Sequence, residues 1–270
     1  MFDYHVHSCQ FSGDASMSME EAIETAIKRN ILEICFTDHT DYDYDGLNND
    51  YKFNYEEYFK TIDFYKNKYK DQISIKHGVE FGLQPHLIEK YSLDASNYNF
   101  DFIICSIHAV EKTDLYKGNF FTNKKQLDAY SVYFQELEQV VDGFDDYSVL
   151  GHLDVIKRYG SFDISLPLDD YREFLTPLLK KIIHKGKGIE LNTSGIRYML
   201  GDYHPSLDTL KLYHSLGGEI ITVGSDAHQI PQVAFDFPNA LKALSEIGFK
   251  YITTFNQRVP KFHSISKLID

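Results

Sequence analysis

The sequence is short of cysteine and of long apolar runs, and both shortages narrow the class of protein. Its three cysteines, Cys9, Cys35 and Cys105, are odd in number and widely spaced, which predicts buried free thiols in a reducing cytoplasm rather than a disulfide framework. No apolar run approaches the roughly 20 residues that a membrane-spanning helix needs, and the N-terminus lacks a signal-peptide pattern. We therefore expect a cytoplasmic protein without a membrane partner.

Positive charge is also scarce. Lysine and arginine together number 27 against 40 acidic residues, which gives a net charge of −13. Without a basic footprint, a long nucleic acid is not expected as a partner, although local cations could still hold a small anionic substrate. The composition is otherwise that of an ordinary globular protein, with 43% hydrophobic and 15% aromatic residues but no tryptophan. We find no internal repeat or linker, so residues 1–270 are expected to form one domain.

The first seven residues, MFDYHVH, have the alternating pattern of a strand. This period places His5 and His7 on the same side of the strand, roughly 7 Å apart along one face. Two imidazoles at that spacing, near the C-terminal end of a strand, are well placed to bind one divalent metal ion.

Strand and helix patterns then alternate along the chain. The expected strands after the first are residues 31–37, 73–80, 102–108, 148–152, 188–192 and 219–225, with 251–255 as an eighth strand or only an edge. Seven or eight such alternations predict an α/β fold with a parallel sheet, either a barrel or a doubly wound open sheet. Ligand-type residues follow many of these strands rather than one switch point, which favours the barrel.

The residues that end these strands share one chemistry. They are His5, His7, Asp38, His39, Glu80, His108, His152, Asp226 and His228. Burying so many ionisable groups at one rim is costly unless cations neutralise them, and imidazole with carboxylate ligands suits zinc, manganese or iron. The remaining histidines are interpreted as structural: His77, His86, His184, His204, His214 and His263.

These residues lie in motifs that resemble the polymerase and histidinol phosphatase (PHP) family, and within it the histidinol-phosphatases. The motifs are DYHVHS, FTDH, GVEFG, SIH, GHLDVIKRYG, IELNTSGIR and GSDAH, and together they span residues 3–228. The resemblance implies a distorted (β/α)7 barrel with three divalent metal ions at the C-terminal ends of the strands.

The resemblance also assigns ligands to the three metals. These are His5, His7, Glu80 and Asp226 for the first, Glu80, His108 and His152 for the second, and Asp14, His39 and His228 for the third. Asp14 is a departure, because many relatives supply a histidine from the first loop and none lies between His7 and His39 here.

The implied activity is that of an L-histidinol-phosphate phosphatase of histidine biosynthesis, which hydrolyses a phosphomonoester with a metal-activated hydroxide. Asp226 and His39 are the candidates to protonate the leaving alkoxide. Only five residues are arginines, and two of them, Arg158 and Arg197, follow expected strand ends, which makes them candidate phosphate clamps. Two alternatives stay open: a phosphoesterase acting on nucleotides or nucleic-acid ends, and a catalytically idle metal-binding protein.

Several acidic residues are expected to support this site. Asp38, Asp3 and Asp154 are candidates to orient ligating imidazoles. The acidic and aromatic residues 41–45 are expected to form a loop, and we hypothesise that this loop acts as a lid over the cationic end of the substrate.

Overall fold

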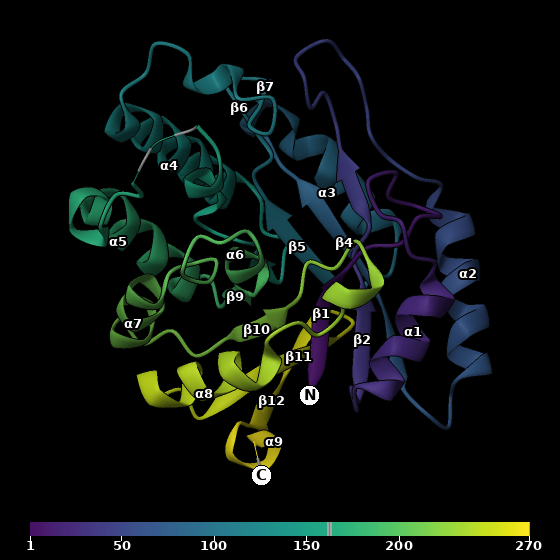
Figure 1. Ribbon diagram of the computed structural model, residues 1–270. Helices are drawn as coiled ribbons and strands as arrows, with labels where there is room; N and C mark the ends of the chain where they lie inside the picture. Colours follow the sequence, from purple (N-terminus) through teal and green to yellow (C-terminus); the bar gives the residue numbers. More distant parts are fainter. Residues whose placement is uncertain (161, 163, 270) are drawn as a thin grey trace.

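A nearly closed barrel of seven parallel strands forms the centre of the computed structural model, which describes residues 1–160, 162 and 164–269 (Figure 1). In the order of their pairing, the strands are β1 (Phe2–Val6), β2 (Glu33–Phe36), β4 (Ser74–Gly82), β5 (Phe102–Ser106), β8 (Val149–Leu150), β9 (Gly188–Asn192) and β10 (Ile221–Gly224). A parallel bridge between Val6 and Ala227 joins the last strand end to the first. The predicted distorted (β/α)7 barrel is thus confirmed, and the doubly wound alternative is wrong.

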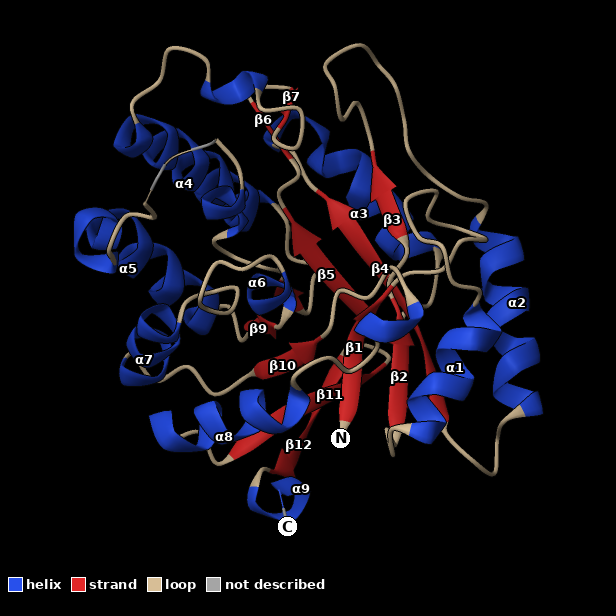
Figure 2. Ribbon diagram, viewed as in Figure 1, coloured by secondary structure: helices blue, strands red, loops and turns tan. Residues whose placement is uncertain are grey.

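Helices surround this barrel (Figure 2). They are α1 (Met19–Lys28), α2 (Tyr55–Lys68), α3 (Ile88–Asn97), α4 (Gln126–Gly143), α5 (Leu168–His184), α6 (Ser194–Arg197), α7 (Leu207–Ser215), α8 (Phe237–Ile247) and α9 (Ser266–Ile269). The 3-10 turns are η1 (Pro85–Leu87), η2 (Asn119–Phe121), η3 (Val155–Arg158) and η4 (Ile230–Gln232). Ser18 and Glu21 form the capping box that begins α1, because each side chain bonds the backbone N–H of the other residue.

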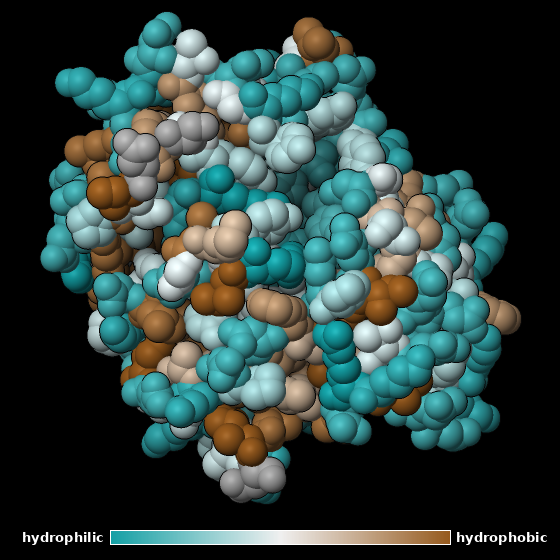
Figure 3. Space-filling model, viewed as in Figure 1, coloured by the Kyte–Doolittle hydropathy of each residue, from teal (hydrophilic) through white to brown (hydrophobic). Residues whose placement is uncertain are grey.

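The core explains why the strands are so apolar. All residues of β1, β5, β9 and β10 are buried, as expected for parallel strands covered on one face by helices and filling the barrel on the other. Because all seven strands run parallel, their C-terminal ends meet at one rim. The face over these ends is hollowed and mostly hydrophilic (Figure 3).

Three segments differ from the expectations. The acidic loop begins with a short strand, β3 (His39–Asp41), which pairs in parallel with the end of β4. The possible eighth strand is β11 (Tyr251–Asn256), which pairs only with β12 (Val259–Ser264) in a separate hairpin and is not part of the barrel. A second hairpin, β6 (Ala109–Val110) with β7 (Thr113–Asp114), follows β5.

The structure also tests the predictions about the cysteines and about membrane-spanning helices. Cys35 and Cys105 are buried free thiols as predicted, but Cys9 is exposed, so the prediction of three buried thiols is wrong at that position. In the part of the chain that the structure describes, none of the helices is both long and apolar enough to span a bilayer.

Candidate metal centre

The predicted ligands converge at the rim of the barrel although they come from separate strand ends. Three groups have ligand atoms within 4.8 Å of one another: His7, His39 and His228; His5, His7 and Glu80; and His39, Glu80 and His108. Because these groups share members, they form one continuous cluster rather than three separate sites.

Glu80, at the end of β4, lies at the centre of this cluster and is fully buried. Its two oxygens lie close to imidazole nitrogens of five residues: His39 Nδ1 at 2.9 Å, His5 Nε2 at 3.3 Å and His7 Nε2 at 3.6 Å from Oε2, and His152 Nε2 at 2.8 Å and His108 Nε2 at 3.2 Å from Oε1. One carboxylate surrounded in this way can bridge two cations.

Two further carboxylates complete the cluster on the side of His7. Asp226 Oδ1 lies 3.5 Å from His7 Nε2 and 3.7 Å from His5 Nε2. Asp14 Oδ2 lies 3.1 Å from His228 Nε2 and 3.5 Å from the Nε2 of His39. The structure therefore brings Asp14, from the first loop, beside His39 and His228.

The donor atoms themselves indicate that the cluster fits cations. Five buried atoms of the cluster have no hydrogen-bond partner among the described residues: His5 Nε2, His7 Nε2, His39 Nδ1, His152 Nδ1 and Glu80 Oε2. Buried polar atoms are almost always paired, yet here the nitrogens of His5, His7 and His39 gather around one oxygen, Glu80 Oε2, at 2.9–3.6 Å. A set of imidazole and carboxylate donors left in this state suits zinc, manganese or iron.

The charges of the cluster are strongly coupled. Burial opposes the charge on Glu80, but His5, His108 and His39 hold the pKa of Glu80 well below its usual range. Burial likewise opposes protonation of His108, yet Asp41 and Glu80 raise the pKa of His108 to about 10. Cations and protons compete for these ligand atoms, so metal binding would release protons.

Hydrogen bonds on the outer ring nitrogens orient four of the imidazoles. The acceptors are Glu190 Oε1 for His5 Nδ1 at 2.7 Å, Asp41 Oδ1 for His108 Nδ1 at 2.6 Å, the Asp226 carbonyl for His228 Nδ1 at 3.1 Å and Ser12 Oγ for His7 Nδ1 at 3.4 Å. Each bond leaves the Nε2 lone pair directed into the cluster.

Sequence reasoning missed the roles of Glu190 and Asp41. Glu190 lies within β9, and an acidic residue inside an otherwise apolar strand was the signal that could have revealed its role. The sequence predicts a loop at Asp41, but the short strand β3 places Asp41 on the same side as His39, two residues before it. The distances of these acceptors from the imidazoles are those of charge-assisted hydrogen bonds.

Two predicted supporting residues act through serines and backbone rather than on an imidazole directly. Asp38 accepts hydrogen bonds from Ser8 N and Ser12 Oγ, both at 2.7 Å, and reaches His7 only through Ser12. Asp3 accepts bonds from Ser225 Oγ at 2.6 Å and Ser225 N at 3.0 Å, which anchors the loop that carries Asp226. Burial raises the pKa of both Asp3 and Asp38 to about 6.

Asp154, the third predicted support, contacts another histidine than His152. Its Oδ1 lies 2.8 Å from His204 Nδ1, and its Oδ2 lies 2.9 Å from Lys157 Nζ. Although burial opposes the charge, Lys157 and His204 lower the pKa of Asp154 to about 2. Burial lowers the pKa of His204 to about 4.

The two predicted phosphate clamps have different surroundings. Arg197 donates from Nη1 to the Ser225 carbonyl at 2.9 Å and from Nη2 to the Asp226 carbonyl at 2.8 Å, while its buried Nε has no partner among the described residues. The guanidinium of Arg158 stacks on Tyr198, 3.3 Å from the ring centroid. Arg197 thus braces the backbone of Ser225 and Asp226 and has one further N–H group that is not used in these contacts.

The hypothetical lid, residues 41–45, is more buried than its acidic composition suggests. Asp41 and Asp43 are buried: Asp41 bonds His108, and Asp43 Oδ1 accepts the N–H of Asn48 at 2.7 Å. The third aspartate, Asp45, is partly exposed. Contact with the cationic end of a substrate stays a prediction for this segment.

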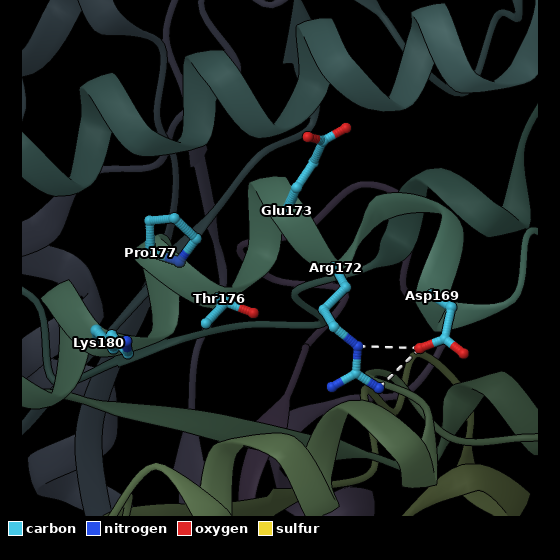
Figure 4. Close-up of a pocket in the computed structure, with 6 residues that line it drawn as sticks. All are labelled: Asp169, Arg172, Glu173, Thr176, Pro177 and Lys180. Carbon is cyan, nitrogen blue, oxygen red and sulfur yellow. Dashed lines mark hydrogen bonds and ion pairs between the residues drawn. The ribbon is translucent and has the colours of Figure 1, made fainter.

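A hollow of about 630 Å³ lies on α5, away from the strand ends (Figure 4). Its Arg172 is neutralised by Asp169, with Nη2 and Oδ1 2.8 Å apart. None of the residues that line this hollow belongs to the cluster at the rim.

Comparison with known proteins finds similarity along nearly the whole chain. The PHP domain family matches residues 3–194. Histidinol-phosphatase of Lactococcus lactis subsp. lactis (strain IL1403) is 32% identical over 256 residues, 94% of each chain, and a probable histidinol-phosphatase of Clostridium acetobutylicum is 29% identical over 97% of this chain and 99% of its own. A crystal structure of histidinol phosphate phosphatase from L. lactis, complexed with zinc, L-histidinol and phosphate, superposes with a TM-score of 0.86 at 30% identity, covering 96% of this chain and 98% of that chain.

Proposed function

The chain belongs to the PHP domain family, and we propose that it is a metal-dependent phosphomonoesterase that hydrolyses L-histidinol phosphate to L-histidinol and inorganic phosphate. The observation that carries the proposal is the carboxylate of Glu80, buried among five imidazoles from four separate segments. A relative that shares nearly the whole chain carries the same activity in its name, and a structure of such an enzyme holds zinc, L-histidinol and phosphate.

We assign three divalent cations to the cluster. His5, His7, Glu80 and Asp226 would hold the first, and Glu80 would share the second with His108 and His152. The third would be held by Asp14, His39 and His228. Asp14 Oδ2 lies 3.1 Å from His228 Nε2 and 3.5 Å from His39 Nε2. When bound, such cations lower the pKa of a coordinated water and neutralise phosphoryl oxygens.

The protein's own residues supply positioning and proton transfer. The free N–H group at Nε of Arg197 and the guanidinium of Arg158 are assigned to the phosphate. The leaving alkoxide requires a proton, and His39 and Asp226 are the candidate donors at the rim. The side chain of His39 is 13% exposed, which gives it access to a substrate above the cluster.

The test is a metal analysis of the purified protein together with assays of phosphate release. Histidinol phosphate, a nucleoside bisphosphate and a 5′-phosphorylated oligonucleotide are compared at equal concentrations. We expect bound zinc, manganese or iron and a preference for histidinol phosphate. Preference for a nucleotide or the oligonucleotide would overturn the substrate assignment, whereas bound metal without release from any substrate would identify an idle metal-binding protein.

The location of this activity stays a prediction. Buried free thiols at Cys35 and Cys105 and a biosynthetic substrate are consistent with the cytoplasm. Fractionation of the native cell with a cytoplasmic marker enzyme would test it.

A further inference from the structure

The central carboxylate of the cluster is bonded by a hydroxyl group that belongs to none of the candidate ligands. Glu80 Oε1 lies 2.6 Å from Ser106 Oγ and 2.8 Å from His152 Nε2. If His152 binds a cation through Nε2, that nitrogen has no proton to donate to Glu80. A serine hydroxyl keeps its proton, so Ser106 is a donor that stays available to Glu80 when the imidazoles bind cations.

The end of β5 fixes this hydroxyl in place. Ser106 is the last residue of β5, its backbone pairs with Gly82 at the end of β4, and its carbonyl accepts the N–H of Leu83 at 2.8 Å. The residue is buried, and its distance to the oxygen of Glu80 is that of a hydroxyl bonded to an ionised carboxylate. Ser106 therefore contributes a directed, charge-assisted hydrogen bond.

A glycine on the neighbouring segment leaves room for this hydroxyl. Gly151 directly precedes His152, and a Cβ atom placed on Gly151 would lie 2.6 Å from Ser106 Oγ and 2.5 Å from Ile104 Cγ2. Non-bonded carbon and oxygen atoms do not approach so closely, so an alanine would push the hydroxyl away. The φ angle of Gly151 is not positive. The need for glycine here is therefore one of space rather than of backbone conformation.

We propose that Ser106 is the positioning residue of Glu80, and that Gly151 preserves the space in which the Ser106 hydroxyl reaches it. The bond to Oε1 fixes the plane of the carboxylate, so that Oε1 faces His152 while Oε2 faces His5. The inference rests on the proposed function in one respect: it takes Glu80 to be a metal ligand.

The first test measures zinc binding rather than turnover. Ser106→Ala removes the donor and leaves the rest of the strand unchanged. Competition with a chromogenic chelator gives the zinc dissociation constants, and mass spectrometry gives the zinc content. We expect roughly 10- to 100-fold weaker zinc binding in Ser106→Ala. Ser148→Ala is the matched control with unchanged zinc binding, because Ser148 is also buried but its hydroxyl accepts the N–H of Ile103.

A double-mutant cycle identifies the route of the effect. In a Glu80→Gln background, Ser106→Ala should cause no further loss of zinc affinity, because its effect passes through the carboxylate. The same loss in both backgrounds, or wild-type zinc binding by folded Ser106→Ala, would overturn the proposal. Circular dichroism and thermal unfolding of the metal-free proteins establish that the variants fold.

A second cycle tests the role of Gly151. Gly151→Ala should weaken zinc binding in the wild-type background, because the new methyl group displaces the Ser106 hydroxyl. In Ser106→Ala, where this hydroxyl is absent, the same substitution should weaken zinc binding by a smaller factor. An equal factor in both backgrounds would show that Gly151 does not act through Ser106 and would overturn this part of the proposal.

A measurement on the wild-type protein needs no variant. A crystal structure of the zinc-loaded protein should show Ser106 Oγ within about 3.0 Å of Glu80 Oε1. A hydroxyl turned away from Glu80 would overturn the proposal even if Ser106→Ala did not fold. Weakened zinc binding in Ser106→Ala, combined with no release of phosphate from histidinol phosphate by the wild type, would reject the proposed function and leave the positioning role intact.

Discussion

The two ends of the barrel bury ionisable groups in opposite ways. At the C-terminal rim, Glu80 Oε2 has imidazole nitrogens nearby but no hydrogen-bond partner among the described residues. At the other end, the buried carboxylate of Asp101 accepts the backbone N–H groups of His77 and Gln257, both at 3.1 Å. Buried groups whose hydrogen bonds are made within the protein, such as Asp101, stabilise the fold. Buried groups without such partners, such as Glu80 Oε2, are suited to bind a ligand instead.

The hairpin of β11 and β12 supplies hydrogen-bond partners to buried groups at the end of the barrel opposite the rim. Tyr4, from the first strand, donates its hydroxyl hydrogen to Glu33 Oε1 at 2.5 Å and accepts the N–H of Phe255, in β11, at 2.9 Å. Substitutions at the rim should therefore change metal binding and turnover, and substitutions at the hairpin end should change stability alone.

The largest effect is expected for Glu80→Gln. The variant keeps the shape of the side chain but loses the charge that two cations would share. Turnover of histidinol phosphate should fall by about 1000-fold or more, since metal ions contribute several kcal/mol to the transition state and 1.4 kcal/mol is a factor of ten. Steady-state kinetics and metal analysis measure the change. Glu138→Gln, on the outer pair with Lys181, is the control; retained metal and turnover in Glu80→Gln would remove Glu80 from the centre of the site.

Removal of the metals should lower the unfolding temperature of the protein, and this effect should depend on the rim residues and not on Asp101. A ligand that binds only the folded state stabilises it by RT ln(1 + [L]/Kd), about 2.7 kcal/mol at 100 times Kd. Thermal unfolding with a chelator should therefore occur at a lower temperature than with zinc. The difference should disappear in Glu80→Gln and persist in Asp101→Asn. An equal unfolding temperature with and without zinc would contradict a metal-binding role for the rim.

The rim could be predicted from the sequence because ligand-type residues follow strand patterns, and parallel strands bring their C-terminal ends together. Asp41 could not be placed, because β3 exists only through its pairing with β4 and the local sequence is polar. The contact of His204 with Asp154, 50 residues away, was equally hidden. Contacts of this kind depend on tertiary structure, which local periodicity does not encode.

A smaller effect is expected for Arg197→Ala. The substitution removes two hydrogen bonds to the carbonyls of Ser225 and Asp226 and the free N–H group assigned to phosphate. We expect kcat/KM for histidinol phosphate to fall by roughly 10- to 100-fold, because one or two charge-assisted bonds contribute about 1.5–3 kcal/mol each. Arg172→Ala, on the outer face of α5, should leave kcat/KM unchanged. An unaltered kcat/KM in Arg197→Ala would exclude Arg197 from phosphate binding.

The smallest effect on activity, and a clear one on stability, is expected for Asp101→Asn. Although burial opposes the charge, the bonds from His77 and Gln257 lower the pKa of Asp101 to about 2, against 3.8 in the unfolded chain. A depressed pKa stabilises the fold above pH 4 and loses this contribution as the pH falls toward 2. The variant should therefore lose about 2 kcal/mol of unfolding free energy at neutral pH, and its deficit should shrink as the pH falls from 5 to 3. Urea unfolding across this range measures the difference. A lower kcat/KM in Asp101→Asn would show that the two ends of the barrel are not independent.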